Sequence, residues 1–111
     1  MTVVEIATAG GPLPYLLESG GLAAAERLLA PHLGGRRAFV VTDETVARLH
    51  AGGVAERLGA PLLALPAGEE HKTLAAAERV VRWLLAHGAE RRDAVVAVGG
   101  GVVTDLAGFA A

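Results

Sequence analysis

Residues 94–109 read AVVAVGGGVVTDLAGF, and this stretch decides the fold class. Ala94 to Val98 is an apolar run without polar alternation, which is typical of a strand buried on both faces of a parallel sheet. Gly99, Gly100 and Gly101 follow it and lead into a second apolar segment with helical spacing. The stretch therefore predicts a strand, a tight glycine turn and the N-terminus of a helix.

Strand and helix patterns also alternate upstream of this stretch. Short apolar or β-branched runs predict strands at residues 2–7, 38–41 and 61–65, and we expect Gly10-Gly11-Pro12 to end the first strand and begin a loop. Apolar side chains at helical spacing predict helices that start at Leu22, at Val46 and after Thr73, the second interrupted by Gly52-Gly53. This alternation indicates an α/β fold, a Rossmann-like parallel sheet with helices on both faces.

The composition bounds the class of protein. The chain has 111 residues, 52% of them hydrophobic and 20% charged, which predicts one globular domain over residues 1–111. A formal net charge of −2 and only four aromatic residues argue against nucleic acid as a partner, and no apolar stretch is long enough to predict a membrane partner. The chain has no cysteine and no signal-peptide pattern, so we expect a cytoplasmic location.

The last residues, Leu106 to Ala111, form an apolar helical segment without a polar cap or a following strand. We expect that the fold is truncated after the glycine-rich strand-turn-helix, and that the chain continues in a longer parent protein. The alternative is a short C-terminal helix that packs fully on the sheet.

The glycine segment has the outline of an anion site. Glycines let a ligand approach the backbone, and a helix N-terminus offers unpaired N–H groups and a partial positive charge that suit a phosphate. Gly99 and Gly101 match the first two glycines of the dinucleotide fingerprint G-x-G-x-x-G, but Thr104 stands at the third, and the Lys-[Ser/Thr] of a Walker A loop is absent. The alternative is a turn that only packs the helix on the strand.

Two acidic residues near predicted strand ends are ambiguous. Asp43, with Glu44 and Thr45 beside it, is either a helix N-cap or a carboxylate for a ribose hydroxyl at the carboxyl edge of the sheet. Asp105 is expected in the first turn of the last helix, where the helix dipole stabilises a carboxylate with or without a ligand.

The loop PAGEEHKT, residues 66–73, carries the only lysine in the chain, Lys72, close to Glu69 and Glu70. It is either a solvated turn or a loop that contacts a ligand. The four histidines show no H-x-H or H-x-x-x-H pairing, and Ser19 is the only serine. We therefore expect no metal site and no catalytic residue within this chain.

The loop and the segment GGGVVTDLAGFAA together resemble the N-terminal, NAD-binding domain of the 3-dehydroquinate synthase family, one of the sugar-phosphate cyclases. The resemblance implies that NAD is the cofactor. It implies these cofactor-binding residues: Asp43, Glu44, Thr45, Glu69, Lys72, Gly100, Gly101, Val102 and Asp105. The chain departs from the usual family pattern at Ala67, His71 and Thr104.

The resemblance also implies a reaction. The family converts a seven-carbon sugar acid phosphate, 3-deoxy-D-arabino-heptulosonate 7-phosphate, into 3-dehydroquinate and phosphate in the shikimate pathway of aromatic amino acid biosynthesis. It implies a zinc or cobalt ion in the full-length enzyme, with ligands in a helical domain outside this chain, and a homodimer. The alternatives are a related sugar-phosphate cyclase, a glycerol-dehydrogenase-like NAD enzyme and a nucleotide-binding module without catalysis, although Val102 favours the cyclases over the dehydrogenases.

Overall fold

The computed structural model describes every residue from Met1 to Ala111. Its five strands are β1 (Thr2–Thr8), β2 (Gly11–Leu17), β3 (Ala38–Asp43), β4 (Leu62–Leu65) and β5 (Ala94–Ala97). Its α-helices are α1 (Ala25–Leu33), α2 (Glu44–Val46), α3 (Gly52–Leu58), α4 (Leu74–Ala86) and α5 (Gly101–Ala110). None of these helices combines the length and the apolar character needed to cross a bilayer.

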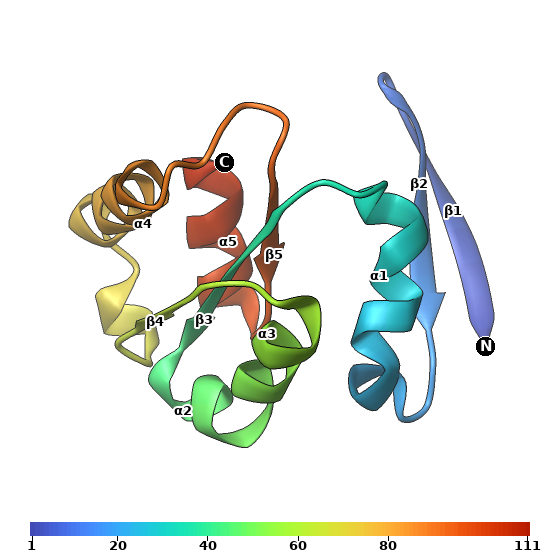
Figure 1. Ribbon diagram of the computed structural model, residues 1–111, viewed down its shortest axis with the longest axis horizontal. Coiled ribbons are helices and arrows are strands. Elements are labelled where there is room, and N and C mark those ends of the chain that lie inside the picture. Colours follow the sequence, from blue (N-terminus) through green and yellow to red (C-terminus); the bar gives the residue numbers. More distant parts are fainter.

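The centre of the fold is a three-stranded parallel sheet in the order β4-β3-β5. Helices α4 and α5 pack on one face of it, in a core that includes Val41, Leu65 and Val80. Helix α3 packs on the other face, where Val40 contacts Ala51 and Ala55 (Figure 1). The predicted α/β class, with a parallel sheet between helices, is confirmed.

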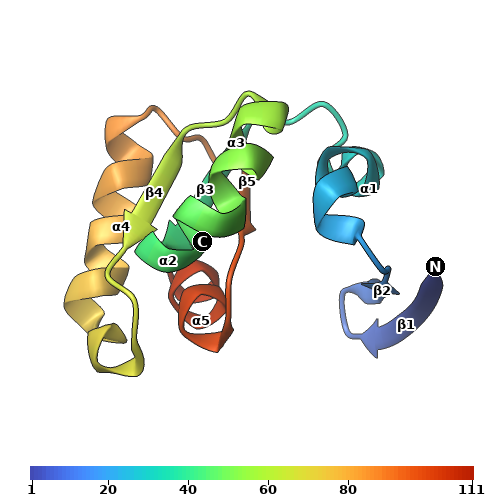
Figure 2. The same ribbon diagram turned by 90° about the horizontal axis from the view of Figure 1, so that it is seen from below.

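The N-terminal segment differs from the prediction. Residues 2–7 are a strand, but the loop expected after Gly10-Gly11-Pro12 is wrong, because the chain turns at Ala9-Gly10 and returns as β2. β1 and β2 form a separate antiparallel hairpin beside α1, outside the parallel sheet (Figures 1 and 2). Prolines in β2 are compatible with a strand here because β2 is an edge strand, whose outward positions need no N–H group.

The helical segment after β3 is continuous, so the interruption expected at Gly52-Gly53 is wrong. A π-helical turn, Ala47–Ala51, links α2 to α3. A π-helical turn contains one more residue than an α-helical turn. The helix face that contains Val46 therefore continues at Ala51, which is fully buried, whereas Leu49 is 60% exposed. Packing on β3 outweighs the low helix propensity of the glycine pair.

The buried stripe of α4 is narrower than the periodicity predicts. Ala77, Val80 and Leu84 are buried, whereas Leu74 and Leu85 are 77% and 69% exposed. The exposed Leu85 therefore supplies a control for a stability test of a buried leucine.

We expect Leu65→Ala to lower the free energy of unfolding by about 2–5 kcal/mol, because Leu65 is 2% exposed and its loss leaves a cavity between the sheet and α4. The control Leu85→Ala should change it by no more than about 0.5 kcal/mol. Urea unfolding followed by circular dichroism measures both. Equal losses would contradict this description of the core.

Candidate functional site at the carboxyl edge of the sheet

The site lies where the direction of the chain connections reverses. β3 continues into α2 and α3 on one face of the sheet, and its neighbour β5 continues into α5 on the other. In open α/β sheets such a reversal leaves a crevice at the carboxyl ends of the two strands. The strand ends are joined here by two hydrogen bonds, from Val98 N to Val41 O at 2.9 Å and from Thr42 Oγ1 to Val98 O at 2.7 Å.

Gly99 lets α5 start directly against the end of β5. Its φ of +156° is a conformation that residues with side chains rarely adopt. A Cβ at this position would lie 2.9 Å from Val103 Cγ2, so a side chain would also push α5 away from the strand. Gly99 is therefore needed to pack α5 against β5. For this glycine, the alternative of a turn that packs the helix on the strand is correct.

Gly100 and Gly101 have a different environment, because a Cβ at either position would meet no atom within 4 Å. Gly100 is the N-cap of α5 and has no side chain to cap the helix. The first intrahelical bond runs from Thr104 N to Gly100 O at 3.1 Å, so helix geometry leaves the N–H groups of residues 101–103 without an intrahelical acceptor. Open space above unpaired N–H groups is the environment that an anion requires.

Thr104, which replaces the third glycine of the fingerprint, turns away from this space. Its hydroxyl lies 3.3 Å from Gly100 O and 3.2 Å from Gly101 O, within the first turn of the helix. The threonine therefore bonds to its own helix and does not fill the space at the N-terminus.

Lys72 connects the loop at residues 66–73 to α5. Its Nζ lies 2.8 Å from Asp105 Oδ2 and 3.8 Å from Glu69 Oε1. The hydrogen bond to Asp105, and then the negative charges of Asp105 and Glu69, raise the pKa of Lys72 above its ordinary value. The ammonium therefore stays charged throughout the neutral range. All three side chains are more than one-third exposed, so a ligand can reach them.

The position expected for Asp105 is wrong in one respect. α5 begins at Gly101, so Asp105 lies in the second turn and not in the first, where the helix dipole is felt most. Its partner is the Lys72 ammonium. The two motifs that the sequence singles out thus meet in an ion pair between residues 33 positions apart.

A cleft of about 340 Å³ lies beside this ion pair, between the start of α4 and the outer side of α5. Besides Lys72 and Asp105 it is lined by Thr73, Leu74, Ala77, Leu106 and Phe109. Sequence reasoning did not assign Leu74 and Phe109 to a site, because helical periodicity cannot tell an exposed apolar residue from a core residue. Thr73 Oγ1 accepts a hydrogen bond from Ala76 N at 3.1 Å and so caps α4, which orients the loop that carries Lys72.

Asp43 occupies the same edge of the sheet but has a different role in this structure. Its Oδ1 accepts a hydrogen bond from Val46 N at 2.8 Å, so the N-cap interpretation is confirmed. Glu44 and Thr45 are exposed residues of the short helix α2, and no ion pair or hydrogen bond links these three residues to Lys72 or Asp105. The structure brings together Glu69, Lys72 and Asp105, and leaves Asp43, Glu44 and Thr45 separate from them.

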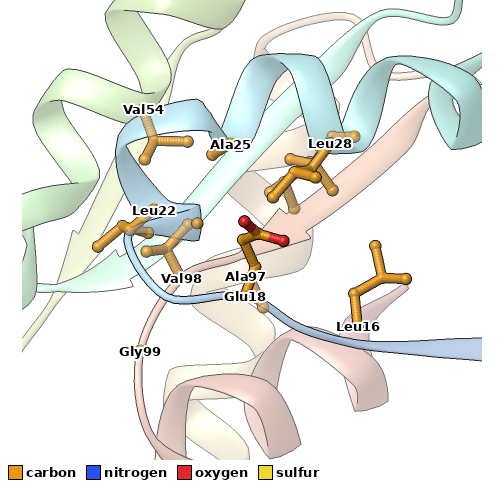
Figure 3. A pocket seen from close by; sticks show the side chains of 12 residues that line it. Leu16, Glu18, Leu22, Ala25, Leu28, Val54, Ala97, Val98 and Gly99 are labelled. Atoms are coloured by element: carbon orange, nitrogen blue, oxygen red, sulfur yellow. The ribbon is translucent and has the colours of Figure 1, made fainter. Parts of the chain in front are cut away.

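A second, larger cleft of about 430 Å³ lies on the other side of the glycine turn, between α1 and β5 (Figure 3). Gly99 and Val98 form one wall, and Leu22, Ala25 and Leu28 form the opposite one. Glu18 is its only ionisable side chain. None of its lining side chains is a cation. No group of three His, Cys, Asp or Glu side chains in the chain is placed to hold a metal ion.

Comparison with known proteins connects this geometry to a family. Residues 62–111 match the family model for the 3-dehydroquinate synthase N-terminal domain. The chain is 52% identical over 97 residues to 3-dehydroquinate synthase of Paracoccus denitrificans, a match that covers 83% of this chain and 26% of the relative. It is 45% identical to the enzyme of Ruegeria pomeroyi over 100% of this chain and 31% of the relative.

Solved structures give the same result. A crystal structure of 2-deoxy-scyllo-inosose synthase in complex with carbaglucose-6-phosphate, NAD+ and Co2+ superposes with a TM-score of 0.80 and 32% sequence identity. The match covers 99% of this chain and 31% of that one. The chain is thus homologous along its whole length to about the N-terminal third of these cyclases, and the resemblance expected from the two motifs is confirmed.

The glycine turn yields a prediction about stability. Gly99→Ala should lower the free energy of unfolding by more than about 1 kcal/mol, because it combines a positive φ with a clash against Val103. Gly101→Ala, two residues later and facing open space, should change it by no more than about 0.5 kcal/mol. Urea titrations of both variants check this, and a stable Gly99→Ala protein would show that the turn does not need its glycine.

Proposed function

We propose that the chain is the NAD-binding part of an enzyme with 3-dehydroquinate synthase activity. The proposal rests on the homology of the chain to the N-terminal part of 3-dehydroquinate synthases. The observation that carries the proposal is the 2.8 Å contact between Lys72 and Asp105, which unites the loop PAGEEHKT and the glycine segment at one edge of the sheet. The solved relative that superposes on this chain contains NAD+.

The residues present fit a dinucleotide. The unpaired N–H groups at the start of α5 and the open space above Gly100 and Gly101 suit the pyrophosphate. We assign contacts with NAD to these glycines, to Val102, and to Glu69, Lys72 and Asp105 from the loop and the second turn of α5. Asp43, with Glu44 and Thr45, belongs to the proposed set as the acidic end of β3, whose Oδ2 stays available when Oδ1 caps the helix.

Bound NAD would supply a transient oxidation of the substrate, which acidifies a neighbouring C–H bond so that phosphate can leave. The residues of this chain bind and orient the cofactor. In this proposal the Lys72 ammonium, which the carboxylates of Asp105 and Glu69 keep charged, donates a hydrogen bond to the cofactor. Nothing in this chain supplies a metal cluster, and we assign the zinc or cobalt ion of the family to residues outside it.

The proposed substrate is 3-deoxy-D-arabino-heptulosonate 7-phosphate, and the products are 3-dehydroquinate and phosphate, in aromatic amino acid biosynthesis in the cytoplasm. We propose a homodimer as the assembly. A second candidate is a cyclase that acts on another sugar phosphate, and the similarity to 2-deoxy-scyllo-inosose synthase favours it over unrelated NAD enzymes.

The test compares NAD affinity among variants by calorimetry. Lys72→Ala should weaken NAD binding by about tenfold or more, because a charge-assisted hydrogen bond is lost. Arg79→Ala is the matched control, since Arg79 is an exposed cation on the neighbouring helix α4, and its removal should leave the affinity unchanged.

Two results would contradict the proposal. One is that the unsubstituted chain, shown to be folded by circular dichroism, does not bind NAD at millimolar concentrations. The other is that Lys72→Ala and Arg79→Ala bind NAD equally well, which would remove the loop from the site.

A further inference from the structure

Thr42 is the only polar residue among the buried residues of the chain, and it is 0% exposed. Its hydroxyl donates a hydrogen bond to Val98 O at 2.7 Å, and Asp43 O lies farther away, at 3.5 Å. A buried hydroxyl without a partner is destabilising, and a valine of the same shape would have no polar group to remove from water. Packing alone therefore does not call for a hydroxyl at this position.

The hydroxyl takes the place of a backbone bond where two strands separate. β3 pairs with β4 as far as Asp43, but it pairs with β5 only as far as Val41. In a regular parallel ladder the next bond would run from Asp43 N to Val98 O. No backbone N–H group donates to Val98 O in this structure, and the Thr42 hydroxyl donates to it instead. The side chain thus keeps this carbonyl paired while the two strands diverge.

Val98 is consequently held at both of its backbone polar groups. Its N–H donates to Val41 O at 2.9 Å, and its C=O accepts the bond from Thr42. The C=O of Val98 and the N–H of Gly99 belong to one planar peptide unit, so a bond that fixes the carbonyl also fixes the plane from which Gly99 continues. The chain then enters α5 through its N-cap, Gly100 (Figure 3). The direction of the first N–H groups of α5 therefore depends on the Thr42 hydroxyl.

We infer that Thr42 is a positioning residue for the cofactor. Its hydroxyl holds the peptide between Val98 and Gly99, and so directs the free N–H groups at the start of α5 toward the pyrophosphate of NAD. Thr42 is fully buried and acts through these two residues, without contact with the ligand. The inference rests on the proposed function, because it takes the N-terminus of α5 as the site of NAD.

The first test separates the hydrogen bond from the volume of the side chain. Thr42→Val keeps the shape and removes the donor, and it should weaken NAD binding, measured by calorimetry, by about three- to tenfold, as expected for one neutral hydrogen bond. Thr42→Ser keeps the donor and removes a methyl group, and it should bind NAD within about twofold of the unsubstituted chain. Thr42→Ala is a second variant without the donor, so the test does not depend on the folding of Thr42→Val alone.

Thr8→Val is the matched control. The Thr8 hydroxyl also donates to a backbone carbonyl, that of Gly11, but it does so in the exposed turn of the β1–β2 hairpin. The same chemical change at this remote hydrogen bond should leave the affinity for NAD unchanged.

The second test needs no NAD. Val98 N–H and Thr104 N–H donate to Val41 O and Gly100 O on the two sides of the glycine turn, whereas Val40 N–H donates to Pro61 O at the opposite edge of β3. In Thr42→Val, amide hydrogen exchange at Val98 and Thr104 should become about three- to tenfold faster relative to exchange at Val40. A variant that only loses overall stability would show the same acceleration at all three amides.

The outcomes distinguish this inference from the proposed function. An unsubstituted chain that does not bind NAD contradicts the proposed function itself. If the unsubstituted chain binds NAD, equal affinity in Thr42→Val would overturn the positioning role, and so would a loss in Thr42→Ser as large as the loss in Thr42→Val, which would show that packing is what matters. Uniform acceleration of exchange would also overturn it. Weaker binding in the donor-free variants alone, with faster exchange confined to the glycine turn, supports it.

Discussion

The burial of the four central residues of β3 is the constraint on which the rest of the structure depends. Phe39 to Thr42 are at most 3% exposed, so both faces and both edges of this strand must be covered. β4 and β5 cover its edges, and α3 and the α4–α5 pair cover its faces. Because β3 lies between its two successors, the chain must reverse direction beside it, and in open α/β sheets the carboxyl ends of the strands at such a reversal are the usual place for a ligand. The location of the candidate site thus follows from how the central strand is buried.

Two glycine functions are combined within three residues at this crevice. Gly99 has no room for a side chain and brings α5 close to β5, whereas Gly100 and Gly101 keep the space above the helix N-terminus open. Gly99 thus positions α5, and the open space beside Gly100 and Gly101 leaves the free N–H groups of this helix accessible. Lys72, in the loop before α4, is held by an ion pair with Asp105 in the second turn of α5, so the loop at residues 66–73 and the start of α5 are joined at one edge of the sheet.

Much of this arrangement follows from the sequence, and the exceptions have physical causes. The strands at β3, β4 and β5 and the helices α4 and α5 are predicted because apolar runs and helical periodicity are strong signals of buried elements. β2 is missed because Gly10-Gly11-Pro12 is a cluster typical of a turn that leads into a loop, and only the structure shows that Pro12 lies in an edge strand. The continuous helix through Gly52-Gly53 is missed because its stability comes from packing on β3. The contact between Lys72 and Asp105 depends on the packing of α4 against α5, which local sequence patterns do not encode.

The central claim is that the carboxyl edge of the sheet binds a dinucleotide through the N-terminus of α5. A titration of the 15N-labelled chain with NAD, followed by amide NMR spectra, tests it most directly. We expect the largest chemical shift changes at the amides of residues 100–103 and at Lys72, with small changes in the hairpin at residues 2–17. Saturable changes that are confined to residues outside the carboxyl edge, or no changes at all with excess NAD, would contradict the claim.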